Sequence, residues 1–308
     1  QENSLNYTQI FLLQSWYSLL IFTLEVPSGA IGDLFSRKAT IFFSITCYLL
    51  GIAVYSVSSS FWGFLIGETF WAFSSSFRSG TGEAFIYDSL KELEKGSEAK
   101  QVYANLESIS LTAFAISSLI GSAVASMFGL RSALYITLAS AFGAWILILT
   151  YKEPAHEKVE FSLSNFVNQM KESVRLSFLD KSLSALMFNS AIIAGIILAV
   201  AWYFQPHMKT SGIPVPLFGA VYAVICVCSA LLVRNVPRLE SRLGPSRTLL
   251  LVDMIIILAI FGFSFLFNPL ISVSCVFIIG TVRSTRNALF NDYLNRFITS
   301  DKRATVLS

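Results

Sequence analysis

Nine apolar runs, each about as long as a helix that crosses a lipid bilayer, account for most of this 308-residue sequence. A helix needs about 20 consecutive apolar residues to cross the hydrocarbon core. Backbone polar groups in lipid must be hydrogen-bonded within the spanning segment, so such runs form helices. We therefore predict an all-α, polytopic membrane protein. Its predicted spans are residues 8–31, 39–57, 61–87, 102–127, 132–151, 183–204, 215–233, 248–267 and 269–290.

The amino-acid composition excludes a water-soluble globular protein. Charged residues make up 13% of the chain and hydrophobic residues 54%, whereas soluble domains carry about 25% charged residues. The four cysteines all lie inside apolar runs, and His156 and His207 are far apart in the sequence. We therefore predict no metal site, no disulfide framework and no cofactor. We also expect no nucleic-acid partner.

The distribution of Lys and Arg predicts how the chain is oriented. If the turn at Arg37 and Lys38 is cytoplasmic and the turns alternate, 17 basic residues fall on the cytoplasmic side, and only Arg131 and Lys209 fall on the other. Cytoplasmic loops of membrane proteins carry such an excess of positive charge. The asymmetry also favours nine spans, because one missed span would move every later turn to the opposite side of the membrane and mix the basic residues between the two sides.

A polar stretch over residues 152–182 divides the spans into two groups. Its apolar residues recur at helical spacing with Lys and Arg nearby, which predicts an amphipathic helix on the cytoplasmic face of the membrane. We therefore predict a transmembrane half over residues 1–151, a cytoplasmic linker over 152–182 and a second transmembrane half over 183–308.

The two halves contain a related segment. "RSGTGEAFIYDSL" begins at Arg78 and "RSTRNALFNDYL" begins at Arg283. Both open with Arg-Ser, both continue through an aromatic-rich part, and they reach Asp88 and Asp292 respectively. Two membrane halves with such parallel repeats are typical of transporters.

The turn between the first two runs carries the most specific motif. In "GAIGDLFSRK", Gly29 is followed four residues later by Asp33 and then by the basic pair Arg37 and Lys38. Gly29 permits close helix approach. Asp33 ends a helix and can address the positive N-terminus of a neighbouring helix. We expect Arg37 and Lys38 to anchor the turn to the cytoplasmic leaflet; a generic positively charged turn is the simpler alternative.

This turn resembles the loop signature between the second and third helices of the major facilitator superfamily (MFS), although Leu34 and Ser36 stand where the family commonly has Arg and Gly. The resemblance implies a bundle of two parallel-repeat halves, with this chain as a fragment covering helices two to ten. A complete nine-helix protein is the alternative. Two further family signatures are altered: Glu68 matches the position of an Arg linked to proton coupling, and Ser117-Ser118 replace a Gly-Pro of drug exporters.

The resemblance also implies a function. The resemblance implies a secondary active transporter that moves a small solute by alternating access. We expect transport to be coupled to protons, and efflux is one of the two directions that the sequence leaves open. The expected partners are a small-molecule substrate, the lipid bilayer and the coupling proton; we expect a monomer in the plasma membrane. A transporter-like receptor or scaffold and a membrane-embedded enzyme are the alternatives. The sequence has no nucleophile–base pair and no phosphate-binding loop, so we expect no enzymatic activity.

Ionisable residues inside the apolar runs are the candidates for function, because a charge at the bilayer centre costs at least about 2.5–3.5 kcal/mol. Glu68 is the first candidate for proton coupling; a hydrogen bond to a neighbouring Ser or Trp is its structural alternative. Glu25, close to Pro27, is the second candidate. Asp253 lies near the cytoplasmic end of its run, and we expect it to be solvated.

Arg283, Arg286, Asn287 and Asn291 form a polar stripe on one helix face, because they recur at three- and four-residue spacing. The family resemblance implies that this stripe faces the central cavity, where it would bind an anionic substrate. A gate, or a helix end whose side chains extend to the interface, is the alternative.

The related segments suggest a cytoplasmic gate between the two halves. We predict that Arg78 or Glu83 pairs with Asp292 or Arg286 when the cavity faces outward, because alternating access rocks one half against the other.

Overall fold

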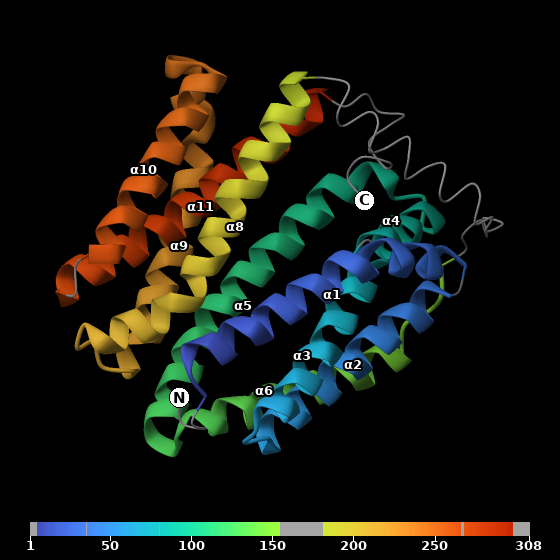
Figure 1. The fold of residues 1–308 in the computed structure, drawn as a ribbon. Coiled ribbons are helices and arrows are strands. Elements are labelled where there is room, and N and C mark those ends of the chain that lie inside the picture. Colours follow the sequence, from blue (N-terminus) through green and yellow to red (C-terminus); the bar gives the residue numbers. More distant parts are fainter. Residues whose placement is uncertain (1–4, 35, 80, 155–180, 266–267, 298–308) are drawn as a thin grey trace. The chain divides into compact units, whose positions relative to one another are not determined.

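The computed structural model describes most of the chain, namely residues 5–34, 36–79, 81–154, 181–265 and 268–297. Within these ranges nearly every residue is helical and none is in a strand, which confirms the all-α prediction (Figure 1). The predicted amphipathic linker helix falls on residues 155–180, which lie outside the described residues.

Each predicted apolar run falls on one or two helices of the described structure. The helices are α1 (Tyr7–Leu34), α2 (Arg37–Val57), α3 (Phe61–Arg78), α4 (Thr81–Glu92), α5 (Ala99–Phe128), α6 (Leu130–Leu149), α8 (Lys181–Thr210), α9 (Pro216–Leu243), α10 (Pro245–Phe265) and α11 (Pro269–Phe297), with a short 3₁₀ turn, η1 (Gly96–Glu98), before α5.

The third run differs from its prediction, because two helices replace the single helix expected over residues 61–87. α3 ends at Arg78, Ser79 has an extended backbone (φ −57°, ψ 138°), and α4 begins at Thr81. Ser and Gly are weaker helix formers than Ala or Leu, and an apolar run read by hydropathy does not register that weakness. Arg78 and Asp88 therefore lie on separate helices, whereas the related segment around Arg283 is continuous within α11.

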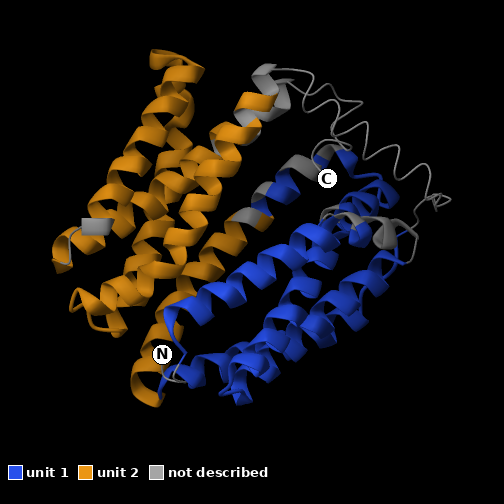
Figure 2. Ribbon diagram, viewed as in Figure 1, with its two compact units in different colours: residues 1–105, 129–169, 308 blue, residues 106–128, 170–307 orange. Residues whose placement is uncertain are grey.

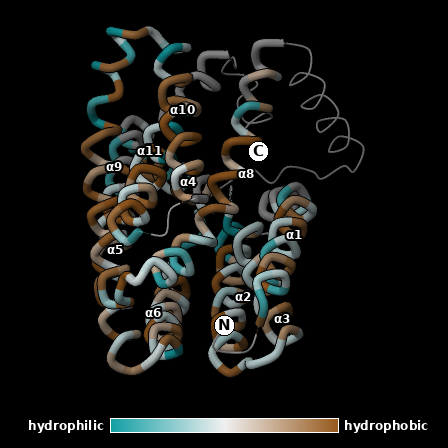
Figure 3. The backbone as a smooth tube through the Cα atoms, turned by 60° about the vertical axis from the view of Figure 1, so that its left-hand side comes forward, coloured by the Kyte–Doolittle hydropathy of each residue, from teal (hydrophilic) through white to brown (hydrophobic). Residues whose placement is uncertain are grey.

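Six of the described helices are long and apolar enough to cross a membrane: α2, α5, α6, α8, α9 and α10. The other three long helices, α1, α3 and α11, carry more polar residues, such as Glu25, Glu68 and Arg286. Figure 3 shows apolar residues along the helices and hydrophilic residues concentrated towards their ends and turns. The number of nine spans stays a prediction, with six spans supported by length and composition.

Local sequence explains where several helices begin and end. Ser36 caps α2 by accepting a hydrogen bond from the Ala39 amide, as N-cap serines do. α9, α10 and α11 each begin at a proline, whose fixed φ suits the first helical position. α9 ends at Gly244, whose φ of 79° is in the left-handed region that glycine adopts without strain.

The chain divides into two compact units, which are described separately (Figure 2). Unit 1 contains residues 1–105 and 129–169, and unit 2 contains residues 106–128 and 170–307. The predicted halves differ from this grouping in one element, because they place all of α5 in the first half, whereas residues 106–128 group with unit 2. The boundaries predicted for the two halves and the linker stay predictions.

In unit 1, α3 packs against both α1 and α2, and α2 also packs against α6. Two glycines make the α2–α3 contact close. A Cβ at Gly51 would collide with the Trp71 ring, and one at Gly67 would collide with the Tyr55 ring. The two rings stack on each other with centroids 4.4 Å apart. This packing fixes the position of the Tyr55 side chain between α2 and α3.

In unit 2, α11 packs against α8, α9 and α10. Its buried residues Val276 and Ile279 belong to one apolar cluster, and Leu289 belongs to a second. Within the same unit, α9 approaches α5 at Gly219, where an added Cβ would collide with the Ser118 carbonyl. α11 is therefore the helix around which the described part of unit 2 is packed.

Candidate functional site

Among the carboxylates of unit 1 whose side chains are described, the most buried is Glu68 on α3, which is 2% exposed. Its Oε1 atom accepts a hydrogen bond from the Tyr55 hydroxyl at 2.5 Å and another from Gln14 Nε2 at 2.8 Å. Both donors are neutral, and among the described residues no Lys, Arg or His forms an ion pair with Glu68. The carboxylate is thus held by α1 and α2 without a compensating charge.

The partners of Glu68 differ from the Ser or Trp neighbours considered in its structural alternative. Gln14 and Tyr55 lie on other helices, 54 and 13 residues away in the sequence. Their only sequence signal is that each is a polar side chain inside an apolar run. Because both bonds go to Oε1, Oε2 is the oxygen on which a proton can be gained or lost without breaking either bond.

Glu25, the second candidate for proton coupling, lies at the opposite end of the α1–α3 contact. It is half-buried, and its Oε1 accepts a hydrogen bond from the Ser79 hydroxyl at 2.8 Å. Ser79 is the residue that ends α3. Glu25 therefore contacts the break between α3 and α4 rather than the Glu68 cluster.

The turn motif is organised around Glu153, which follows α6. Its carboxylate accepts hydrogen bonds from the Ser36 hydroxyl (2.6 Å) and from the Arg37 and Lys38 amides (both 2.8 Å). These amides are at the N-terminus of α2, where unpaired N–H groups and the helix dipole favour a negative charge. Glu153 thus caps the N-terminus of α2. The helix-end role that the sequence suggested for Asp33 stays a prediction, because its side chain, like the surroundings of Gly29, is outside the described part.

Arg37 and Lys38 bind the protein itself, which corrects the expectation that they anchor the turn to the lipid leaflet. Arg37 Nε lies 2.6 Å from Asp88 Oδ2 on α4, and both side chains are largely buried. Lys38 Nζ donates to the carbonyls of Leu149 (3.0 Å) and Tyr151 (2.5 Å) at the end of α6. Both cations therefore have partners within unit 1, on α4 and at the end of α6.

These contacts join the ends of α2, α4 and α6 in unit 1. Besides the Arg37–Asp88 pair, Lys152 Nζ lies 3.1 Å from Glu92 Oε1, and the Phe85 and Tyr151 rings stack with centroids 5.6 Å apart. The sequence signal for Glu153 is slight: one carboxylate between the end of an apolar run and Pro154. The residues of the motif therefore hold the ends of α2, α4 and α6 together.

In unit 2 the buried charge is an ion pair. Arg286 on α11 is 1% exposed, and its Nε donates to Asp253 Oδ1 on α10 at 2.7 Å. Its Nη2 donates to Asn189 Oδ1 on α8 at 3.1 Å, and Ser190 Oγ lies 3.4 Å from Nη1. The pair therefore joins three helices.

The expectation that Asp253 is solvated was wrong. Asp253 is 6% exposed because it faces Arg286 rather than the end of α10. The polar stripe on α11 is also divided. Arg286 is buried in the ion pair, whereas Arg283 and Asn287 are exposed. Of the stripe residues whose side chains the structure describes, Arg283 and Asn287 are open to a ligand, and Asn291 is outside that part.

The structure describes part of the predicted gate. Arg78 is exposed at the C-terminal end of α3. Arg286 already has Asp253 as its partner in unit 2. The side chains of Glu83 and Asp292 lie outside the described residues.

The described residues contain no group of three or more His, Cys, Asp or Glu side chains placed to hold a metal ion. The buried charged side chains among them, Glu68, Asp253 and Arg286, form hydrogen bonds or an ion pair within the helical bundle.

Comparisons with known proteins agree with this architecture. A family model described as the Major Facilitator Superfamily matches residues 1–308. A Bacillus subtilis (strain 168) protein described as the uncharacterized MFS-type transporter YxaM is 22% identical over 315 residues, which cover 98% of this chain and 76% of that protein.

The crystal structure of the nucleoside transporter NupG (D323A mutant) has the same fold, with a TM-score of 0.77 and 14% identity over 96% of this chain and 76% of NupG. The family model spans the whole sequence. This chain is thus a member of the Major Facilitator Superfamily.

Proposed function

We propose that this protein is a secondary active transporter in the plasma membrane, that it moves a small solute by alternating access, and that Glu68 couples transport to protons. Family membership supports the transporter class. The observation that carries the coupling is the pairing of a 2% exposed carboxylate with two neutral donors and no cation among the described residues.

A carboxylate in this position has two usable states. The ionised form is expensive in a low-dielectric interior unless a charge or several donors compensate it. The Tyr55 and Gln14 donors supply part of that compensation, and a proton on Oε2 removes the charge while keeping both bonds. If water reaches Glu68 in one conformation and not in the other, Glu68 exchanges its proton with the solution from which the water enters. It keeps that proton while the site is closed to water.

The test uses the intact protein in proteoliposomes with an imposed pH gradient and a panel of labelled nucleosides, hexoses and lipophilic cations. We expect one class to accumulate with the gradient. Glu68→Gln should abolish that accumulation while leaving exchange of labelled for unlabelled solute. Glu98→Gln, at an exposed position paired with Lys95, is the matched control and should accumulate normally.

Two outcomes would contradict the proposal. Gradient-driven accumulation by the Glu68→Gln variant would return Glu68 to a structural role. Saturable binding of a solute without any flux would favour a receptor with a transporter fold.

The gate and the cavity stripe also remain proposals. Because Arg286 is paired with Asp253, we propose Arg78, Glu83 and Asp292 as the cytoplasmic gate, and Arg283 and Asn287 as residues open to substrate. Asp292→Asn should increase labelling of cysteines placed on the cytoplasmic side of the cavity. Unchanged labelling would exclude Asp292 from the gate.

A further inference from the structure

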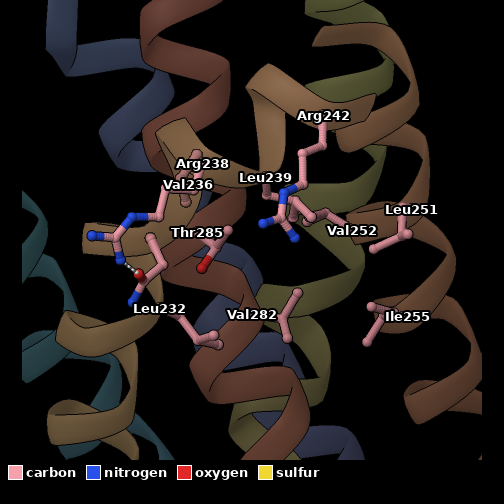
Figure 4. Close-up of a pocket in the computed structure, with 11 residues that line it drawn as sticks. Leu232, Val236, Arg238, Leu239, Arg242, Leu251, Val252, Ile255, Val282 and Thr285 are labelled. Atoms are coloured by element: carbon pink, nitrogen blue, oxygen red, sulfur yellow. Dashed lines mark hydrogen bonds between the residues drawn. The ribbon is translucent and has the colours of Figure 1, made fainter. Parts of the chain in front are cut away.

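A pocket of about 370 Å³ lies between α9, α10 and α11 of unit 2 (Figure 4). Its volume is within the range of about 300–1,000 Å³ typical of small-molecule sites. Seven of its 11 lining residues are Leu, Ile or Val. It is separate from Glu68 in unit 1, and neither member of the Arg286–Asp253 pair lines it.

The aliphatic residues that line the pocket are buried at its inner end and exposed at its mouth. Val236 and Val252 are 8% and 2% exposed. At the mouth, Leu232, Leu251 and Ile255 are 44%, 40% and 37% exposed. α9 and α10 are both candidate membrane spans, and large exposed aliphatic side chains on such helices suit contact with hydrocarbon rather than with water. The mouth is therefore suited to admit an acyl chain from the bilayer.

One end of the pocket is basic. Arg238 and Arg242 lie on the last two turns of α9 and are exposed. Arg238 donates to Asn235 on its own helix at 2.7 Å. Arg242 has no hydrogen bond or ion pair with any residue that the structure describes, and Figure 4 shows its guanidinium extending towards the space between Val252 and Thr285. No residue of the described part takes up its donors, and arginine binds a phosphate in a bidentate manner.

The pocket also contains a buried polar atom without a partner. Thr285 is 6% exposed and lines the pocket, and its Oγ1 has no hydrogen-bond partner among the described residues. Buried hydroxyls normally have one. A ligand that carries an ester or hydroxyl oxygen next to its anionic group would supply the missing hydrogen-bond partner of Thr285.

The pocket lies along the cytoplasmic end of the span predicted over residues 215–233. Ten residues separate Leu232, near the end of that span, from Arg242 on α9, which is about 15 Å at the helical rise of 1.5 Å per residue. The aliphatic end of the pocket therefore borders the hydrocarbon, and the arginine end lies beyond it at the headgroup level. The positive-inside pattern assigns the arginine end to the cytoplasmic leaflet, where anionic lipids attract such basic pockets.

We propose that this pocket binds an anionic phospholipid, with its phosphate on Arg242, its glycerol-ester region at Thr285 and one acyl chain between the aliphatic walls. A soluble anion would leave the walls unfilled, and a zwitterionic lipid would oppose the arginines with its own cation. The site is independent of the proposed transport function.

The experiment measures lipid binding to the purified, delipidated intact protein by native mass spectrometry. The three probes are dioleoyl-phosphatidylglycerol, dioleoyl-phosphatidylcholine and glycerol 1-phosphate. We expect one phosphatidylglycerol to bind at concentrations at which the other two do not. Arg242→Gln should weaken this binding about tenfold, equivalent to about 1.4 kcal/mol. Leu251→Trp, which fills the half-exposed mouth, should abolish it.

Arg234→Gln is the matched control, because Arg234 is an exposed arginine of α9 that does not line the pocket. It should bind phosphatidylglycerol as the wild type does. Equal binding of phosphatidylcholine, competition by glycerol 1-phosphate, or unchanged binding in both Arg242→Gln and Leu251→Trp would each overturn the proposal. A dimer that Leu251→Trp dissociates would show instead that a second copy covers this face.

Discussion

The two units bury a carboxylate in opposite ways. In unit 1, Glu68 receives two hydrogen bonds from neutral side chains. In unit 2, Asp253 faces the guanidinium of Arg286, and both residues are almost fully buried. The pair in unit 2 has no net charge when both groups are ionised, whereas the charge of Glu68 is removed only by a proton. The comparison suggests that Asp253–Arg286 is fixed and that Glu68 is the group that can change its charge.

The largest expected effect comes from breaking the ion pair. Arg286→Met leaves Asp253 buried and unpaired, which should lower the free energy of unfolding by about 3–5 kcal/mol. Replacing both residues, with Asp253→Leu added, should recover much of that loss, because a buried pair replaced by apolar groups is often close to neutral. Thermal unfolding of the purified variants in detergent measures both. A double variant no more stable than the single one would mean that Arg286 stabilises the bundle through Asn189 and Ser190 instead.

A smaller effect should follow when Glu68 loses a donor. Tyr55→Phe removes the hydroxyl and keeps the ring against Gly67 and Trp71, so the loss should be about 1–3 kcal/mol, the usual cost of an unsatisfied buried group. In the Glu68→Gln background the same change should cost less, because a neutral amide needs the donor less than a carboxylate does. Equal costs in both backgrounds would show that Glu68 is already neutral when the protein is at rest.

Glu153 sharpens the comparison, because it is a carboxylate held by backbone amides at a helix end. Glu153→Gln should cost about 1 kcal/mol, as expected for weakening a helix N-terminal contact. Because this site lies beyond the end of α6, added salt should reduce the difference between the variant and the wild type. The difference for Arg286→Met should not respond to salt. Unfolding midpoints at low and high salt test this contrast.

The smallest stability effect is expected for Glu68→Gln. The amide oxygen of Gln can accept from Tyr55 and Gln14 as Oε1 does, so the change in the free energy of unfolding should stay below about 1 kcal/mol. Infrared difference spectra on a pH change should show the C=O band of a protonated carboxylic acid in the wild type but not in the variant. A band that persists unchanged in Glu68→Gln would assign the proton to another carboxyl, with Glu25 the next candidate.

Part of this molecule was predictable from its sequence. The apolar runs predicted the helices, because lipid leaves the backbone few alternatives. The motif at residues 29–38 indicated the superfamily, and the cost of a charge at membrane depth singled out Glu68 and Arg286. Each of these inferences depends on residues close together in the sequence or on the chemistry of a single side chain.

Only the tertiary structure decided which groups are paired. Asp253 and Arg286 are 33 residues apart, and Glu153 is 116 residues from Arg37. The sequence around each of these residues does not indicate which distant residue it contacts. The contact of Ser79 with Glu25, 54 residues away, is likewise visible only in the structure. Whether a carboxylate is solvated, paired with a cation or held by neutral donors is decided by the neighbouring helices, because the electrostatic energy of a charge depends on what lies within a few ångströms of it.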